Sequence, residues 1–313
     1  MNGSNVDRKY LAYASSTLGA VIGGCSFVFS KIVLGAGMSF YQMIFCRMVI
    51  AVAAALLLYA LGLFPLQLKG KPVVKAMLCS LFYPGFGLML EMLALNYTTT
   101  AELSAFDAMV PVGVMILARL IFREEQTGLQ RLAIVTSVAG VLLIVFSDGF
   151  QLGTSHLGHI IVLVAVVCSC CYNLTVKWLT SHFTNPEITF INILTALILY
   201  SLVMLINGGV GELRSLSFAP GQLAQVIASL CFLGVCNSVG TAYMNSFSIR
   251  IIGATRHTSF AGIITLTTVV LGRLVLQEHL LPLKYLGMLL IVAGAWGANY
   301  FSPAAIAGRK KEA

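Results

Sequence analysis

Long apolar segments separated by short polar turns dominate the chain. Ten of them approach the ~20 residues that a helix needs to cross a bilayer, and they lack the short alternating pattern of a transmembrane barrel. The predicted spans are 11–33, 39–62, 73–95, 101–122, 128–147, 157–178, 187–207, 221–247, 252–276 and 283–302. Turn residues separate several of them, as at Gly35-Ala36-Gly37 and Leu281-Pro282. The pattern predicts an all-α integral membrane protein.

The composition agrees with this prediction. Hydrophobic residues make up 58% of the 313 positions and charged residues only 10%, with a mean hydropathy of +0.93. A soluble domain usually carries about 25% charged residues. The chain therefore has too few charges to cover its surface in water, which argues against a soluble enzyme, a disordered protein and a nucleic-acid-binding domain despite the net charge of +8.

Basic residues are distributed unequally between the two ends of the predicted spans. With ten spans, the end that holds both termini collects thirteen of the 19 lysines and arginines, and the opposite end holds only Arg214 and Lys284. Because cytoplasmic loops carry the excess of basic residues, both termini are expected in the cytoplasm. The lack of a transit-peptide pattern favours a bacterial plasma membrane.

The second half of the chain repeats the first. Segment 117–144 aligns with 271–298 at an offset of 154 residues without gaps, with nine identities in 28 positions. The identities include Arg119 and Arg273, Glu124 and Glu278, and Gly140 and Gly294. We therefore predict two repeats of five helices, at 1–150 and 151–313. An odd number of spans in each repeat makes the two repeats inverted, an arrangement typical of transporters that bind substrate near the membrane midplane.

Several motifs match a known family. They are the turn at 94–101, Pro111 and segment 118–124 in the first half, and 252–255 and 273–278 in the second. With these motifs the chain resembles the drug/metabolite transporter superfamily, in its ten-helix EamA-type branch. The resemblance implies a central cavity formed mainly by the first, third, fourth, sixth, eighth and ninth helices. It also implies alternating access and, usually, export of small metabolites.

Two acids inside the spans depart from the family pattern. A charge at the centre of a spanning helix costs about 2.5–3.5 kcal/mol, so such residues are candidates for function. Asp107 lies six residues into the fourth span and four residues before Pro111, whose missing N–H leaves the Asp107 carbonyl without its helical partner. Glu91 lies in the outer third of the third span. If these two acids share a cavity, they are expected to form a proton site.

The other charges within spans are expected to have mixed roles. Arg47 is deep enough to bind an acid or a substrate carboxylate, with a structural ion pair as the alternative. Glu102 is interpreted as a favourable acid in a first helical turn, and Lys31 as a side chain that reaches the membrane interface. Arg119 and Arg273 are expected to form salt bridges with the hairpin acids Glu124 and Glu278.

Uncharged polar and aromatic side chains are expected to line the cavity. As a set they suit an amino acid or similar zwitterion, or an amphipathic drug, better than a multiply charged phosphate. These candidates are Tyr83, Asn96 and Tyr97 in the first half, and Tyr172, Asn173, Trp178, Asn237, Ser238, Tyr243 and Asn245 in the second.

The leading functional hypothesis is a secondary transporter that exports a small metabolite such as an amino acid, with protons as the coupling ion. The alternatives are efflux of amphipathic toxic compounds and a passive facilitator of the same fold. A membrane-embedded enzyme is disfavoured, because the five histidines lie near span ends and the eight cysteines form no metal-binding spacing. The chain has no GxxxxGK[ST] loop for ATP. We expect no cofactor, no metal and no nucleic-acid partner, and a monomer or weak homo-oligomer in the lipid bilayer.

Overall fold

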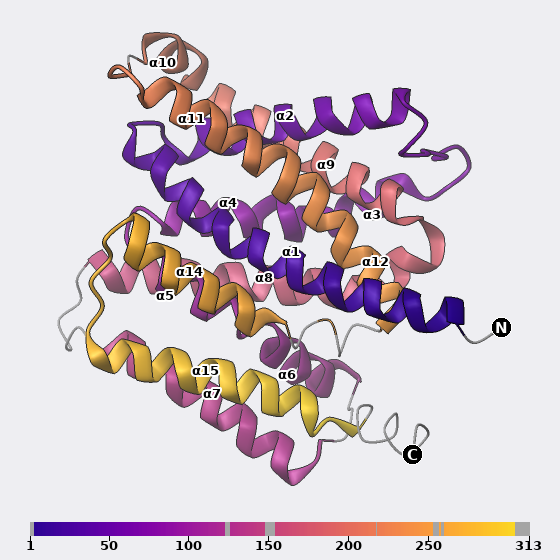
Figure 1. Cartoon of the computed structure of the whole chain (residues 1–313), viewed down its shortest axis with the longest axis vertical. Helices are drawn as coiled ribbons and strands as arrows, with labels where there is room; N and C mark the ends of the chain where they lie inside the picture. The colour runs from indigo at the N-terminus through magenta and orange to yellow at the C-terminus, as the bar shows by residue number, and fades with distance from the viewer. Residues whose placement is uncertain are drawn as a thin grey trace.

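The computed structural model describes residues 3–122, 126–147, 154–216, 218–252, 257 and 260–303, and the regular secondary structure of this part of the chain is helical. The helices run between two ends of one bundle (Figure 1). We call the end at which α1 begins and α15 ends the near end, and the opposite one the far end. Six predicted spans form continuous helices: α1 (Gly3–Gly35), α2 (Phe40–Ala60), α7 (Gly128–Phe146), α8 (Thr154–His182), α9 (Asn185–Ile206) and α15 (Pro282–Tyr300).

The third and eighth spans are irregular in the middle: the third is kinked at Tyr83, and the eighth contains a wide-turn π-helical segment. The third consists of α3 (Val73–Ser80), η1 (Leu81–Phe86) and α4 (Gly87–Ala94), and the eighth consists of α11 (Gln222–Cys231), η2 (Phe232–Thr241) and α12 (Ala242–Ile252). Under the repeat offset of 154, residue 83 corresponds to 237, so the two irregular segments occupy equivalent places in the two halves.

The fourth and ninth spans also depart from a single helix. The fourth breaks between α5 (Thr100–Asp107) and α6 (Val110–Phe122), just before Pro111. The described part of the ninth begins a new helix, α14 (Ala261–Val275). A further short helix, α10 (Gly209–Ser215), lies in the far-end connection before α11. The predicted spans at 73–95 and 101–122 are both present, at Val73–Ala94 and Thr100–Ile121, and the structure adds that each is interrupted in its middle.

The helices are those of a multi-pass membrane protein. Within the described residues, eight helices or broken helices are long and apolar enough to cross a bilayer, and α14 is a shorter apolar helix. Large apolar side chains are exposed along the outer faces of the bundle, among them Leu57, Leu132 and Leu289. Such a surface suits lipid and not water.

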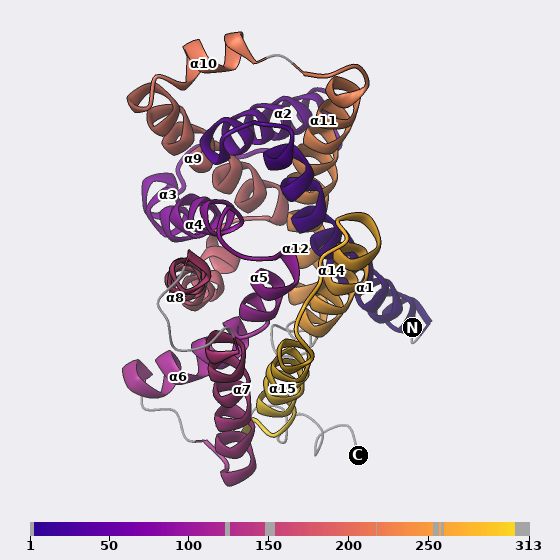
Figure 2. The ribbon, with the colours of Figure 1, turned by 90° about the vertical axis from the view of Figure 1, so that its left-hand side faces the viewer.

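The packing of the helices shows the inverted repeat directly. α1 packs against α12 and α14, and its counterpart α8 packs against α4 and α6. α2 contacts η2, and its counterpart α9 contacts η1. Each helix of the second half thus runs opposite to its counterpart and has the equivalent neighbours. α7 and α15, the last helices of the two halves, lie side by side at one edge of the bundle (Figure 2).

Small residues let α7 and α15 approach closely. A Cβ atom at Gly140 would lie 2.6 Å from the carbonyl oxygen of Gly287, and one at Gly294 would lie 2.5 Å from the backbone nitrogen of Ser137. The Ser137 hydroxyl donates to the carbonyl of Ile291, at 3.2 Å, and these two residues are 154 apart. Equivalent residues of the two halves therefore meet where the helices cross, as a two-fold relation between the halves requires.

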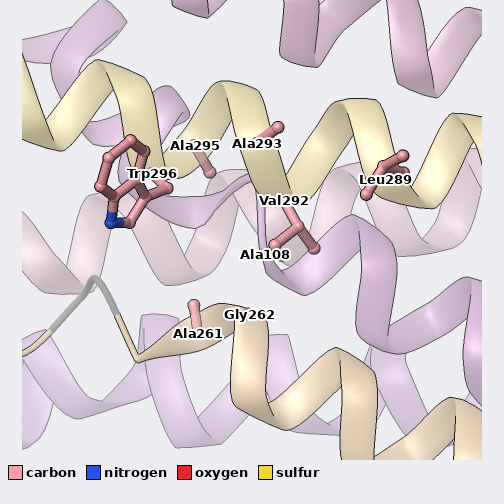
Figure 3. Close-up of a pocket in the computed structure, with 8 residues that line it drawn as sticks. All are labelled: Ala108, Ala261, Gly262, Leu289, Val292, Ala293, Ala295 and Trp296. Atoms are coloured by element: carbon pink, nitrogen blue, oxygen red, sulfur yellow. The ribbon is translucent and has the colours of Figure 1, made fainter.

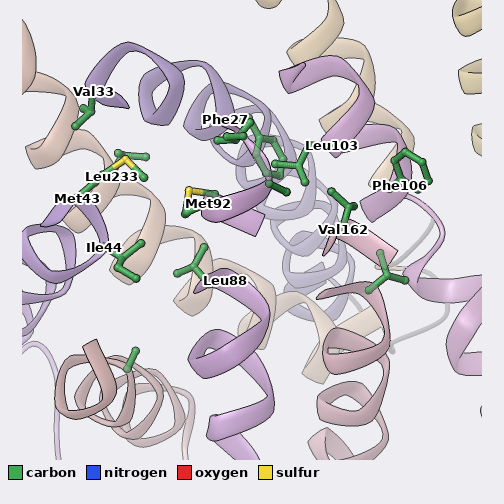
Figure 4. Close-up of a cluster of buried hydrophobic side chains, with 14 of the residues drawn as sticks. Phe27, Val33, Met43, Ile44, Leu88, Met92, Leu103, Phe106, Val162 and Leu233 are labelled. Carbon is green, nitrogen blue, oxygen red and sulfur yellow. The ribbon is translucent and has the colours of Figure 1, made fainter. Parts of the chain in front are cut away.

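The main apolar core draws on both halves. Phe27, Met43 and Leu103 come from the first half, and Val162 and Leu233 from the second; all are buried in one cluster (Figure 4). Three predicted features lie outside the described residues. They are the repeat boundary at 150/151, the acid Glu124 that was expected to pair with Arg119, and positions 253–255 of the second-half motif.

Glycine at position 140 is a strict packing requirement. We expect Gly140→Ala to lower the free energy of unfolding by about 1–3 kcal/mol, because the added methyl group meets backbone atoms of α15. Thermal unfolding of the purified protein in detergent measures this change. Gly128→Ala is the matched control at the start of the same helix, where nothing lies within 4 Å. Equal effects of the two substitutions would contradict the packing shown here.

Candidate functional site

Three charged side chains from three helices meet inside the bundle. Arg47 extends from α2, Glu91 from α4 and Asp107 from the last residue of α5. Arg47 and Glu91 are 5% and 2% exposed, and Asp107 is partly buried. Electrostatically, Glu91 has both Asp107 and Arg47 as neighbours. Sequence analysis predicted all three as site residues, and the structure brings them together into what we call the central cluster.

The arginine of this cluster is fixed by the second half of the chain. Arg47 Nε donates to the hydroxyl of Ser238, at 2.8 Å, and that hydroxyl lies 3.0 Å from the carbonyl of Leu233 in the π-helical segment η2. Gly234 permits this approach, because a Cβ atom there would lie 3.0 Å from the Arg47 carbonyl oxygen. The guanidinium is thus held between the halves with donors left over for an anionic group.

The acids of the cluster retain the capacity to accept hydrogen bonds. Asp107 Oδ1 is buried and has no hydrogen-bond partner among the described residues. Tyr83 and Glu91 are electrostatic neighbours. A buried carboxylate oxygen without a donor is rare in folded proteins and points to a ligand, a water molecule or a proton at that position.

Tyr83 reaches the acids because the third span is broken there. Its backbone is extended (φ −153°, ψ 129°) within η1, which also contains Pro84. The hydroxyl of Tyr200, from α9 of the other half, lies 2.5 Å from the carbonyl oxygen of Pro84 and 2.9 Å from that of Gly85. Tyr200 is fully buried and donates to backbone that the break leaves without helical bonds.

A row of polar side chains continues from Tyr83 toward the near end. The rings of Tyr83 and Tyr172 lie 6.2 Å apart. Asn192 donates to the Tyr172 hydroxyl at 2.7 Å and accepts from the Ser80 hydroxyl at 2.7 Å. Tyr172 was predicted as cavity lining, whereas Asn192 and Ser80 were not.

Several of the other predicted lining residues lie near the ends or on the outer face of the bundle. Asn96 and Tyr97 lie in the far-end turn after α4, and Trp178 packs on His182 near the end of α8, with ring centroids 4.7 Å apart. Tyr243 is exposed opposite Phe64. The remaining three are Asn173, which donates to the Ser169 carbonyl of its own helix; Asn245, which lies against Gly19; and Asn237, which is partly buried in η2.

The Lys31 ammonium donates to the carbonyls of Leu95 and Thr98 in the far-end turn after the third span. One expectation about a charged residue near the far end was wrong. Arg273 does not pair with the Glu278 carboxylate. Instead its guanidinium donates to the Glu278 backbone carbonyl at 3.3 Å, and the carboxylate accepts from another helix.

Sequence analysis missed three polar residues that complete the site: Ser80, Asn192 and Tyr200. Ser80 ends α3, and Asn192 and Tyr200 both belong to the apolar helix α9, where a polar residue is usually explained by packing or by a hydrogen bond between helices. Their partners are 112 to 116 residues away along the chain. A buried polar residue in a span opposite a proline-containing span was the available signal.

An apolar groove lies beside the helix breaks of the fourth and ninth spans. Ala108 and Gly262, which are equivalent under the offset of 154, line it together with Trp296 and Leu289 of α15 (Figure 3). Trp296 and Leu289 are exposed on the outer surface of the bundle.

Among the described residues, no group of three or more His, Cys, Asp or Glu side chains is placed to hold a metal ion.

Comparisons with known proteins agree with this architecture. The family model described as EamA-like transporter family matches residues 11–146 and 156–300. The chain is 27% identical to the uncharacterized transporter YcxC of Bacillus subtilis (strain 168) over 289 residues, which is 92% of each protein. A protein of known crystal structure matches with a TM-score of 0.60 and 16% identity, covering 91% of this chain and 97% of the other. The last comparison bears on the fold alone.

The charges of the central cluster are expected to depend on one another. Arg47→Met leaves two buried acids without their cation and should destabilise the protein by about 3–5 kcal/mol. Adding Glu91→Gln to Arg47→Met should recover part of this loss, because one of the unpaired charges is removed. A double-mutant cycle of unfolding free energies measures the coupling. Arg131→Met, on the exposed face of α7, is the control with little expected effect. Additive effects of the two substitutions would show that Arg47 and Glu91 do not interact.

Proposed function

Because the chain belongs to the EamA-like transporter family, we propose that it is a secondary transporter that exports a small zwitterion, such as an amino acid, in exchange for protons by alternating access. It is a membrane transporter and not an enzyme. Substrate, coupling and direction are the parts of this proposal that extend beyond the family. The observation that carries them is the central cluster of Arg47, Glu91 and Asp107.

The cluster has complementary places for both charges of a zwitterion. The Arg47 guanidinium is a suitable partner for a carboxylate. Glu91 and Asp107 are suitable partners for an ammonium group. A multiply charged phosphate would instead need several cations, and only Arg47 is present in the cluster.

The same cluster gives a physical reason for proton coupling. Two ionised acids and one arginine leave one negative charge in a buried place, and such a charge is costly inside a membrane. Either a proton or the ammonium group of the substrate neutralises it. The proton and the substrate ammonium group therefore compete for the same carboxylates. On either side of the membrane, release of the proton favours binding of the substrate, and release of the substrate favours binding of the proton. Competition of this kind produces exchange of substrate for protons.

The excess of basic residues at the near end supports the plasma membrane with both termini in the cytoplasm. In this orientation the far end faces outward, and proton entry from the outside drives export.

A second candidate function is efflux of amphipathic compounds, which the apolar groove favours. Ala108 directly follows Asp107, and the groove lies at the outer surface of the bundle. An apolar group in the groove would therefore lie beside the turn that carries a central acid. A compound with a cationic head and an apolar tail could use both.

Flux measurements in proteoliposomes test the proposal. Vesicles are loaded with a labelled amino-acid mixture, and flux is followed with and without an imposed pH gradient. We expect the gradient to drive one or more amino acids against their concentration gradient. Asp107→Asn and Glu91→Gln should each abolish this gradient-driven accumulation, because one of the acids that proton and substrate share has been neutralised.

Glu212→Gln is the matched control, since Glu212 is an exposed acid in α10 at the far end. It should retain gradient-driven flux. Coupling that persists in Asp107→Asn and Glu91→Gln would contradict the role of the acids, and flux that only equilibrates would indicate a facilitator. Flux of tetraphenylphosphonium without any amino-acid flux would favour the second candidate.

A further inference from the structure

A second group of buried charges lies at the far end, apart from the central cluster. Glu102 Oε1, in the first turn of α5, lies 2.6 Å from Lys284 Nζ, in the first turn of α15. The Glu102 and Lys284 side chains are 2% and 9% exposed. His159 of α8 is 1% exposed, and its Nε2 lies 3.7 Å from the second oxygen of Glu102. Sequence analysis interpreted Glu102 only as a first-turn acid and Lys284 only as a loop charge.

Glu102 lies in the first turn of α5, as expected, and also caps this helix, but the cap uses only one of its oxygens. Its Oε2 accepts from the backbone N–H of Thr99 at 3.2 Å and from the Thr98 hydroxyl at 2.5 Å. The other oxygen is directed to Lys284. A cap alone needs no buried cation from a helix 182 positions away in the sequence. The ion pair therefore has a purpose beyond starting α5.

A second link lies beside the ion pair. The backbone N–H and the hydroxyl of Thr100 both donate to the Glu278 carboxylate, at 2.9 and 3.0 Å. Glu278 is positioned by Gln277, which adopts a left-handed backbone (φ 55°), and by its own N–H, which donates to the Gly272 carbonyl at 3.1 Å. The left-handed region favours glycine, so this turn is held against a conformational preference.

Both links join the two halves of the transporter. Glu102 and Thr100 begin the fourth span of the first half, and Lys284 and Glu278 flank the start of the tenth span of the second half. Lys31 of α1 lies in the field of both acids, so the first helix is also part of the group. A movement that opens the far end between the halves must separate these contacts.

The chemistry of the contact suits a closure that opens repeatedly. A buried ion pair stabilises a structure little in net terms, because the loss of hydration offsets most of the attraction between the charges. When the halves part and water enters, both charges recover their hydration. If apolar side chains lay in the same place, opening would expose them to water, and this exposure would destabilise the open state. The ion pair therefore seals the far end without making its opening prohibitively costly.

We propose that Glu102–Lys284, with Thr100–Glu278 beside it, is the latch that holds the far end of the transporter closed. The inference rests on alternating access, but not on the substrate or on proton coupling. Loss of one partner should shift the protein toward a state that is open at the far end, because the closed state would then bury an unpaired charge.

Thiol labelling tests the latch without any substrate. The eight native cysteines are replaced, and Leu103→Cys is introduced as a reporter. Leu103 is fully buried in the main core and directly follows Glu102. Labelling by a polar maleimide is measured on the protein in nanodiscs. Lys284→Met and Glu102→Gln should each raise the labelling rate at least about tenfold. The reason is that an unpaired buried charge destabilises the closed state enough to change the ratio of open to closed protein by more than tenfold.

Two controls separate opening from unfolding. Lys284→Arg keeps the charge and should label as slowly as the parent. Lys71→Met removes the cation of the near-end pair Lys71–Glu187, whose atoms also lie 2.6 Å apart, and should leave the reporter slow. If Lys284→Met is not monodisperse by gel filtration, Glu278→Gln replaces it with the same expected increase. Unchanged labelling in the latch variants, or an equal increase in Lys71→Met, would overturn the proposal. Neither result depends on amino-acid flux, so failure of the latch and failure of the proposed function remain distinguishable.

Discussion

Burial of charge in an apolar bundle is the constraint from which the rest of this structure follows. Arg47, Glu91 and Asp107 come from three different helices, and each would be costly inside the membrane without the others. To bring them together, the third span breaks at Tyr83 and the fourth ends its first helix at Asp107. The break in the third span frees backbone carbonyls that need new partners, and Tyr200 of the other half donates to those of Pro84 and Gly85. The site is therefore a product of irregular backbone as much as of charged side chains.

The repeat supplies the scaffold, whereas the chemistry of the site is unequal between the halves. Under the offset of 154, Glu91 corresponds to Asn245 and Asp107 to Ala261, so the acids belong to the first half only. The second half has the π-helical segment η2 at the place equivalent to the kink, and η2 carries the Ser238 hydroxyl that accepts from Arg47. Duplication thus explains the two-fold packing of α7 on α15. It does not predict which half carries charge, and this asymmetry suits a carrier that must distinguish the two ends of its substrate.

Two groups of charges, one central and one at the far end, divide the work of the proposed cycle. The central cluster binds and exchanges substrate and proton. The far-end latch connects the same two halves about seven residues away along α5, from Thr100 to Asp107. Because one short helix carries residues of both groups, a shift of α5 on binding reaches the latch directly. The near end has its own pair between the halves, Lys71 and Glu187, so closure by ion pairs is available at both ends.

The spans, the inverted repeat and the buried acids could be predicted from the sequence, because hydropathy and an internal alignment are local or linear signals. Arg47, Glu91 and Asp107 were recognisable as charges in apolar helices. The pairing of Glu102 with Lys284 was not, since an acid in a first helical turn already has an ordinary explanation. The kink at η1 and the π-helical segment η2 were missed because both keep the apolar composition of a helix. Asn96 and Tyr243 were wrongly predicted to line the cavity, because polarity alone does not say toward which face of the bundle a side chain points.

The most direct test of the account is to measure distances at both ends of the bundle in the same protein. Spin labels at Asn96→Cys and Leu281→Cys report the far end, and labels at Lys69→Cys and His182→Cys report the near end; all four residues are exposed. Pulsed electron paramagnetic resonance at acidic and at alkaline pH gives the distance between the labels of each pair. The account predicts opposite changes, with the far-end distance lengthening whenever the near-end distance shortens. Distances that change in the same direction, or that never change, would contradict two halves rocking about a buried charged centre.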